Sequence, residues 1–108
     1  MKARVAPTAC CGHVAIPPSK SMAHRAIICA ALAQGTSVIK NVAYSQDIKT
    51  TIAGMQQLGA DIRMEEDQVT ITGIQDFTIQ QKEVFCCESG STLRFFIPIF
   101  SLCNQEIT

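Results

Sequence analysis

Pro17-Pro18-Ser19-Lys20-Ser21-Met22-Ala23-His24-Arg25 is the segment from which the organisation of this 108-residue chain can be worked out. The two prolines fix φ and cannot donate backbone hydrogen bonds, so they hold the incoming chain extended. Ser19 is a favourable N-cap, and the apolar residues from Met22 onward have helical spacing. We therefore predict a helix from about Ser19 to Gln34, with Gly35 as its C-terminal cap.

The first turn of this helix carries cations where acids are usual. Lys20 and Ser21 lie at its positive end, and Arg25 lies one turn beyond Ser21 on the same face. An anion bound between them would remove the conflict with the helix dipole. The alternative is a solvated helix start whose long side chains extend into water. His24 could reach the same pocket, but we expect it to be a partly exposed structural residue.

Alternating and helical apolar patterns predict the other elements. Thr36 to Val42 is β-branched and alternating, which is typical of a strand. A second helix is expected from a cap at Asp47 to Leu58, closed by Gly59. Besides these we expect a hairpin of Ala60–Met64 and Gln68–Thr72, short strands at Lys2–Val5, His13–Ile16 and Val84–Cys87, a helix over Gly90–Cys103 that contains Pro98, and a strand starting at Gln105–Thr108.

Two segments resemble motifs of the enolpyruvylshikimate-phosphate synthase (3-phosphoshikimate 1-carboxyvinyltransferase) family. The opening segment resembles its Pro-Pro-Ser-Lys-Ser-x-x-x-Arg signature, and Glu88-Ser89-Gly90-Ser91-Thr92-Leu93-Arg94 is similar to its Asn-Ala-Gly-Thr-x-x-Arg loop. Between them, Ser45-Gln46-Asp47 and Met55-Gln56-Gln57-Leu58-Gly59-Ala60 fall where the family has its second helix. The resemblance runs in order from His13 onward. It implies an α/β fold of βαβαββ units in an inside-out α/β barrel, of which this chain would hold an incomplete part.

The resemblance also implies a division of the chain. Residues 1–17 would be N-terminal strands that belong to, or lead from, another lobe. Residues 18–108 would be the first βαβαββ unit and the start of the second. Because Gln105–Thr108 resembles an unpartnered strand start, we expect an N-terminal fragment of a longer enzyme. The prolines would lie near the crossing between lobes, which puts Lys20 at the hinge.

The implied reaction moves the enolpyruvyl group of phosphoenolpyruvate to the 5-hydroxyl of shikimate 3-phosphate and releases phosphate, in the shikimate pathway of aromatic amino-acid biosynthesis. Lys20 would be catalytic and contact both substrates, Ser21 and Arg25 would bind shikimate 3-phosphate, and Gly90 would bind phosphoenolpyruvate. The resemblance implies no cofactor and no metal. Since the proton-transfer residues would lie beyond Thr108, the isolated chain is expected to be inactive.

The second motif departs from the family at two positions. Glu88 stands where many relatives have Asn, and an acid there should repel a phosphate, so Glu88 is not expected to be a ligand. Phe95 stands where others have Pro. Gly90 lets backbone N–H groups approach an anion without a Cβ in the way, although it could also be a plain helix-start turn. Arg94 would bind substrate or only brace the loop.

Two other functions are compatible with these residues. A related transferase acts on a UDP-amino sugar, but it opens with Lys-Asn in place of the Ser-Lys-Ser found here. A non-catalytic phosphoanion-binding module would use the same cationic residues without turnover. Asp47 could be a general base, but its place at a helix start favours capping.

The amino-acid composition limits the classes of partner that we expect this protein to bind. Lys plus Arg and Asp plus Glu both number 9, so no basic excess points to nucleic acid or an anionic membrane. The apolar runs Ala26–Ala33 and Phe95–Cys103 are about half the roughly 20 residues of a spanning helix. We expect a cytoplasmic protein with two small-molecule substrates, no nucleic-acid or membrane partner, and a monomeric full-length form.

The six cysteines include no Cys-x-x-Cys spacing. A metal site built from Cys10, Cys11, His13, Cys86 and Cys87 is the alternative to reduced thiols, and the missing ligand spacing disfavours it. Cys29 falls within the apolar pattern of the first helix, where we expect it to be buried.

Overall fold

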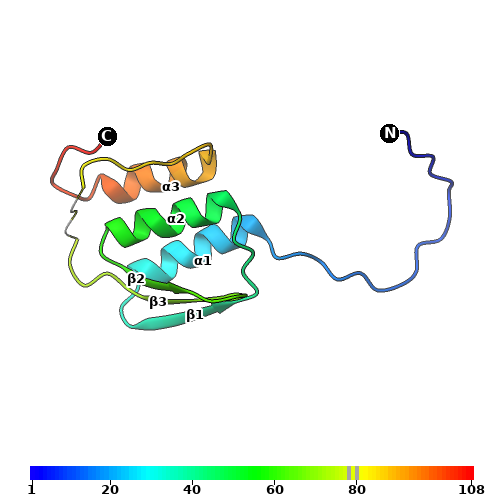
Figure 1. Cartoon of the computed structure of the whole chain (residues 1–108), viewed down its shortest axis with the longest axis horizontal. Coiled ribbons are helices and arrows are strands. Elements are labelled where there is room, and N and C mark those ends of the chain that lie inside the picture. Colours follow the sequence, from blue (N-terminus) through cyan, green and yellow to red (C-terminus); the bar gives the residue numbers. More distant parts are fainter. Residues whose placement is uncertain (78, 80) are drawn as a thin grey trace.

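The helical and alternating patterns of the sequence correspond to helices and strands in a computed structural model, which describes residues 1–77, 79 and 81–108. The order helix, strand, helix, strand, strand agrees with the sequence patterns, and a further helix follows (Figure 1). The elements are α1 (Lys20–Leu32), β1 (Thr36–Lys40), α2 (Gln46–Gln57), β2 (Asp61–Met64), β3 (Gln68–Thr72) and α3 (Gly90–Phe100).

The strands form an antiparallel sheet with β3 in the centre, in the order β1-β3-β2. Thr36 of β1 and Asp61 of β2 both lie opposite Thr72 of β3. Because side chains alternate along a strand, β3 turns Val69 and Ile71 to the same face, and both are fully buried. The predicted hairpin is therefore confirmed.

The helices form two layers over one face of this sheet. Figure 1 shows α1 and α2 next to the strands and α3 on their far side, and the contacts of α3 with α1 and α2 agree with this. Ile27 of α1, Ile52 and Met55 of α2 and Ile71 of β3 fill the space between helices and sheet, each at most 1% exposed. All three helices begin at the same end of the body (Figure 1).

Residues 1–17 are exposed and extend away from this body (Figure 1). The strands predicted at Lys2–Val5 and His13–Ile16 are wrong, since the structure assigns no strand within residues 1–17. A short strand is stable only when it is paired, and none of the described residues pairs with this segment. The first strand expected for a βαβαββ unit is thus missing from the described part of the chain.

Helix α1 starts as predicted but ends early. Ser19 is its N-cap, whereas its C-cap is Ala33 and its last residue Leu32, two residues short of Gln34. Gly35, with φ 89°, belongs to the turn into β1 and is not the cap. The prediction for Cys29 is also wrong, because this residue is exposed on α1.

Helix α2 is capped by a different residue from the one predicted. The Ser45 hydroxyl accepts a hydrogen bond from the Ile48 N–H, so Ser45 is the N-cap and Asp47 lies inside the first turn. At the other end Gly59, with φ 103°, follows the C-cap Leu58, as expected for a helix closed by glycine.

The segments predicted as strands near the C-terminus are joined by only two backbone hydrogen bonds, too few to make either of them a strand. The Val84 N–H donates to the Thr108 carbonyl and the Thr108 N–H to the Lys82 carbonyl, both at 2.8 Å. These two bonds flank residue 83, which is the arrangement of a parallel pair. No strand is assigned within residues 81–108, and α3 ends at Phe100 instead of Cys103.

The end of β3 packs against the end of α1 with no room for a side chain. Gly73 donates its N–H to the Gly35 carbonyl at 3.0 Å, and Ile74 donates to the Ala31 carbonyl at 2.8 Å. A Cβ on Gly73 would lie 1.6 Å from the carbonyl oxygen of Ala33. This close approach fixes how α1 lies on the sheet.

Candidate anion-binding site

The predicted site residues lie at the end of the body where the three helices start. Each helix start is capped by a serine, and the uncompensated N–H groups there make it the positive end of the helix. Ser19, Ser45 and Ser89 are these caps, and their hydroxyls accept from the N–H groups of Met22, Ile48 and Thr92 at 3.4, 3.4 and 3.2 Å.

Lys20 joins the start of α1 to the start of α2. Its Nζ donates to Oδ2 of Asp47 at 2.7 Å, and the two side chains are 57% and 27% exposed. This hydrogen bond from Lys20 lowers the pKa of the Asp47 carboxyl. Asp47 is thus the partner of Lys20 and not a capping residue. An exposed pair of this kind contributes little to stability, so Lys20 can turn to a ligand at small cost.

Arg25 joins α1 to α3. Its Nη1 donates to the Ser21 carbonyl at 2.9 Å, and its Cζ lies 5.4 Å from the centroid of the Phe95 ring. The aromatic face attracts the guanidinium and orients it. Phe95, which departs from the family motif, thereby positions Arg25. The structure brings Ser21 and Arg25 together, and both remain exposed.

The start of α3 is open to a ligand. Gly90 is exposed, and a Cβ built on it would meet no atom within 4 Å. Its N–H donates to the Glu88 carbonyl at 3.1 Å, so it is already used. Among the described residues, Ser91 has the first-turn N–H of α3 that lacks an intramolecular acceptor. Arg94 lies exposed further along α3.

A buried chain of polar side chains, absent from the sequence predictions, connects the helices beneath this surface. His24 is 1% exposed, which corrects the expectation of a partly exposed residue, and its Nδ1 lies 2.8 Å from Oγ1 of Thr51. Thr51 Oγ1 lies 2.9 Å from Thr92 Oγ1, which lies 2.6 Å from Oγ of Ser89. Nε2 of His24 has no hydrogen-bond partner among the described residues.

The sequence does contain a pattern that indicates this buried chain of polar side chains. Thr51 falls three residues after Ile48 and four before Met55, on the buried stripe of α2. Thr92 precedes the buried Phe96 by one turn in the same way. A hydroxyl within an apolar helical stripe needs a buried partner, and that requirement indicates a polar contact between helices.

Burial lowers the pKa of His24 below its ordinary value of 6.5, with Asp47 opposing the shift and Lys20 and Arg25 adding to it. Below pH 6.5 the unfolded chain therefore binds more protons than the folded one. We expect the free energy of unfolding to fall with decreasing pH from there, by at most about 1.4 kcal/mol per unit for this one proton. Urea titrations between about pH 5 and 8 measure this slope.

One variant isolates the contribution of His24 to this slope. His24→Gln should flatten the dependence, because it removes the buried imidazole. Equal slopes for the wild-type chain and His24→Gln would show that His24 is not the titrating group.

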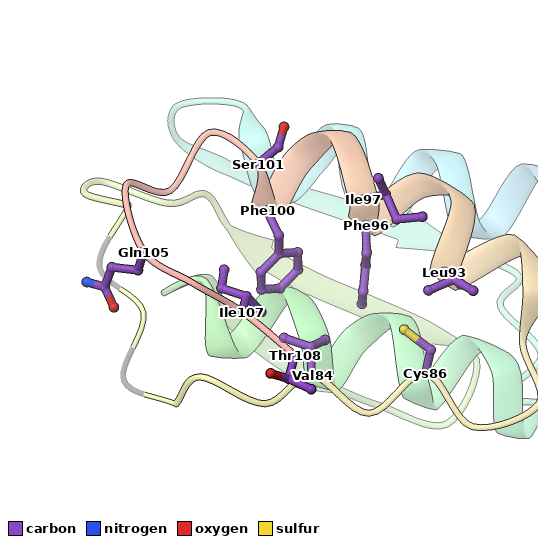
Figure 2. A pocket seen from close by; sticks show the side chains of 10 residues that line it. All are labelled: Val84, Cys86, Leu93, Phe96, Ile97, Phe100, Ser101, Gln105, Ile107 and Thr108. Atoms are coloured by element: carbon purple, nitrogen blue, oxygen red, sulfur yellow. The ribbon is translucent and has the colours of Figure 1, made fainter.

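An apolar hollow lies elsewhere and is not part of this site. Figure 2 shows Phe96 and Phe100 of α3 pointing toward Val84 and Ile107. The hollow measures about 340 Å³ and is lined mainly by apolar side chains, with none of the charged site residues. It offers no cation to a phosphate.

The alternative metal site is not formed. Among the described residues, no three His, Cys, Asp or Glu side chains lie close enough together to hold a metal ion. Cys10, Cys11 and Cys87 are exposed, and Cys86 is half-buried. Within the described ranges, every helix is too short or too polar to cross a membrane.

Comparisons with known proteins agree with the residue pattern. A family model described as EPSP synthase (3-phosphoshikimate 1-carboxyvinyltransferase) matches residues 5–108. A 3-phosphoshikimate 1-carboxyvinyltransferase of Clostridium perfringens (strain SM101 / Type A) is 52% identical over 109 residues, which cover 98% of this chain and 25% of the relative. The enzyme of that name from Clostridium novyi (strain NT) is 42% identical over 114 residues, covering 97% of this chain and 26% of its own.

A solved structure shows the same fold. The EPSP synthase from Acinetobacter baumannii superimposes with a TM-score of 0.75 at 25% identity, over 83% of this chain and 21% of that one. The chain thus spans about a quarter of the length of the curated relatives it matches. The predicted α/β class is confirmed as part of this larger fold. On the match to residues 5–108 and the 52% identity, the chain belongs to the EPSP synthase family.

Proposed function

We propose that this chain forms part of the substrate site of a 3-phosphoshikimate 1-carboxyvinyltransferase. The observation that carries the proposal is the gathering of Lys20, Ser21 and Arg25 at the same end of the body as the open turn at Gly90. Two anionic substrates held side by side need cations and hydroxyls, which α1 supplies, and backbone N–H groups, which the start of α3 supplies. The family and its named members, including the C. perfringens enzyme, support this assignment.

In the proposed reaction, the enolpyruvyl group passes from phosphoenolpyruvate to the 5-hydroxyl of shikimate 3-phosphate, and phosphate leaves. Arg25, with its planar fork, and Ser21 bind shikimate 3-phosphate. Lys20 exchanges Asp47 for the substrates and stabilises charge that develops between them. The N-terminus of α3, with Gly90 and the N–H of Ser91, receives the phosphate of phosphoenolpyruvate, and Arg94 braces this turn.

Two further assignments are part of the proposal. Residues 1–17, which extend away from the body, belong with another lobe of the full-length protein, and Lys20 lies at the junction. The full-length form is a monomer in the cytoplasm. The charge of the phosphorylated substrates retains them in that compartment.

A chimera tests the proposed activity. Residues 5–108 replace the matching segment of the C. perfringens relative, and phosphate release is measured with both substrates, with each alone, and with a UDP-amino sugar as acceptor. We expect release only with phosphoenolpyruvate and shikimate 3-phosphate together. A folded chimera that is inactive while its parent is active would overturn the assignment.

The 108-residue chain alone is the matched comparison in the same assay. Because it spans about a quarter of its relatives, we expect it to release no phosphate from the two substrates. Turnover by the chain alone would show that the residues of the described body suffice for the reaction.

A further inference from the structure

The buried polar chain His24–Thr51–Thr92–Ser89 has no role in the proposed chemistry, yet it connects the two segments that bind substrate. One end, His24, lies one turn from Lys20 and next to Arg25 on α1. The other end, Ser89, caps α3 immediately before Gly90. Thr51 of α2 and Thr92 of α3 bridge them through contacts of 2.8, 2.9 and 2.6 Å.

Burial makes these contacts restrictive. Thr51 and Thr92 are fully buried, His24 is 1% exposed and Ser89 is 3% exposed. Water cannot replace a broken contact here, so any shift of α3 relative to α1 leaves a buried hydroxyl or imidazole without its partner. Apart from Nε2 of His24, the side-chain polar atoms of this network have partners, and these contacts hold the three helices in one arrangement.

The number of hydroxyl protons determines the direction in which the hydrogen bonds of the buried polar chain run. If Ser89 donates to Thr92, Thr92 to Thr51 and Thr51 to Nδ1 of His24, every hydroxyl proton is used, and Ser89 Oγ still accepts from the Thr92 N–H. In the opposite direction the Ser89 proton would need another acceptor, and the described residues supply none. Nδ1 of His24 is then the acceptor, and Nε2 carries the proton.

We propose that this chain of hydrogen bonds is a positioning element that fixes the start of α3 relative to α1, and so sets the separation between the phosphoenolpyruvate turn and the shikimate 3-phosphate residues. The proposal rests on the proposed function for its substrates. Its structural part, the coupling of Ser91 to Thr51 through the buried chain, stands without it.

Thr51→Val removes the central hydroxyl and keeps the shape of the side chain. In the chimera, we expect KM for phosphoenolpyruvate to rise about tenfold, because the turn at Gly90 loses its position. KM for shikimate 3-phosphate should change less than about twofold, since its residues stay on α1. Thr51→Ser, which keeps the hydroxyl, should restore both values. If Thr51→Val does not fold, Ser89→Ala at the end of the chain is expected to show the same split.

Thr50→Val is the matched control. Thr50 is also buried on α2, but its Oγ1 donates to the Gln46 carbonyl of the same helix at 2.9 Å. Both valine variants remove one buried threonine hydroxyl from α2, and only Thr51→Val breaks a contact between helices. The proposal is overturned if the two variants shift the KM values alike.

An NMR comparison on the 108-residue chain decides the structural part independently. The ¹⁵N shifts of His24 should show the proton on Nε2, and Thr51→Val should move the amide of Ser91 while Thr50→Val leaves it in place. If the wild-type chimera is inactive, the proposed function fails, and this comparison alone judges the coupling. An unmoved Ser91 amide in Thr51→Val would then overturn it.

Discussion

Gly73→Ala is expected to prevent the chain from adopting this fold. The new Cβ would lie 1.6 Å from the carbonyl oxygen of Ala33 and 2.8 Å from its carbonyl carbon, and backbone cannot swing aside as a side chain can. Relief requires the end of α1 to leave the sheet, which breaks the bonds from Gly73 to Gly35 and from Ile74 to Ala31. We expect a loss above about 3 kcal/mol, a large part of the stability of an ordinary domain.

Gly90→Ala is the control for this prediction, since a Cβ there would meet nothing within 4 Å. At a helix start alanine is a better residue than glycine, so we expect a change of less than about 1 kcal/mol. Urea denaturation followed by circular dichroism compares the two variants. Similar midpoints for Gly73→Ala and the wild-type chain would mean that α1 and β3 are not packed as described.

Arg25→Ala is expected to weaken binding of shikimate 3-phosphate by about 100-fold and of phosphoenolpyruvate far less. The guanidinium is held by the Ser21 carbonyl and the Phe95 ring, so its remaining N–H groups are oriented for a ligand. Because Arg25 is exposed, its removal should change the stability by less than about 0.5 kcal/mol. Calorimetric titration of the chimera with each substrate measures both affinities.

Two other substitutions sharpen this test. Arg63→Ala removes an exposed arginine of β2, whose contact is with Asp61, and should leave both affinities unchanged. Arg25→Lys keeps the charge but loses the planar fork, and an intermediate affinity for shikimate 3-phosphate is expected. Equal losses for the two substrates in Arg25→Ala would contradict the assignment of Arg25 to one of them.

Local sequence signals predicted the helix ends that are set by residues adjacent to them in the sequence. Ser19 after two prolines marked the start of α1, and Gly59 marked the end of α2. At the start of α2 two good caps compete, Ser45 and Asp47. Both types cap well, and burial of Ile48 and Ile52 in the core selects the register that begins after Ser45.

Pairing over long distances could not be predicted in this way. Residues 13–16 have the composition of a strand, but a strand needs a partner, and the described residues hold none for them. Thr108 forms backbone hydrogen bonds with the segment at Val84, which is distant from it in the sequence. No local pattern records which segments meet.

The candidate site was predicted in its residue types but not in its contacts. The sequence indicates that Lys20 and Ser21 lie in the first turn of a helix and that Arg25 lies one turn beyond Ser21 on the same face. It does not show that Asp47 neutralises Lys20 or that Phe95 faces Arg25, because these contacts depend on how three helices pack. His24 shares the buried stripe of Ile27, Ile28 and Ala31, and this spacing was a usable sign of its burial.

The exposed segment of residues 1–17 has a consequence for how mutational scans of this chain should be interpreted. In a scan scored on folding, substitutions along this segment should be silent, whereas nearly every substitution at Gly73 should be lost. In a scan scored on activity of the chimera, intolerance within residues 5–17 would report contacts made with the remainder of the polypeptide. The difference between the two scans would therefore map, residue by residue, where the rest of the protein touches this segment.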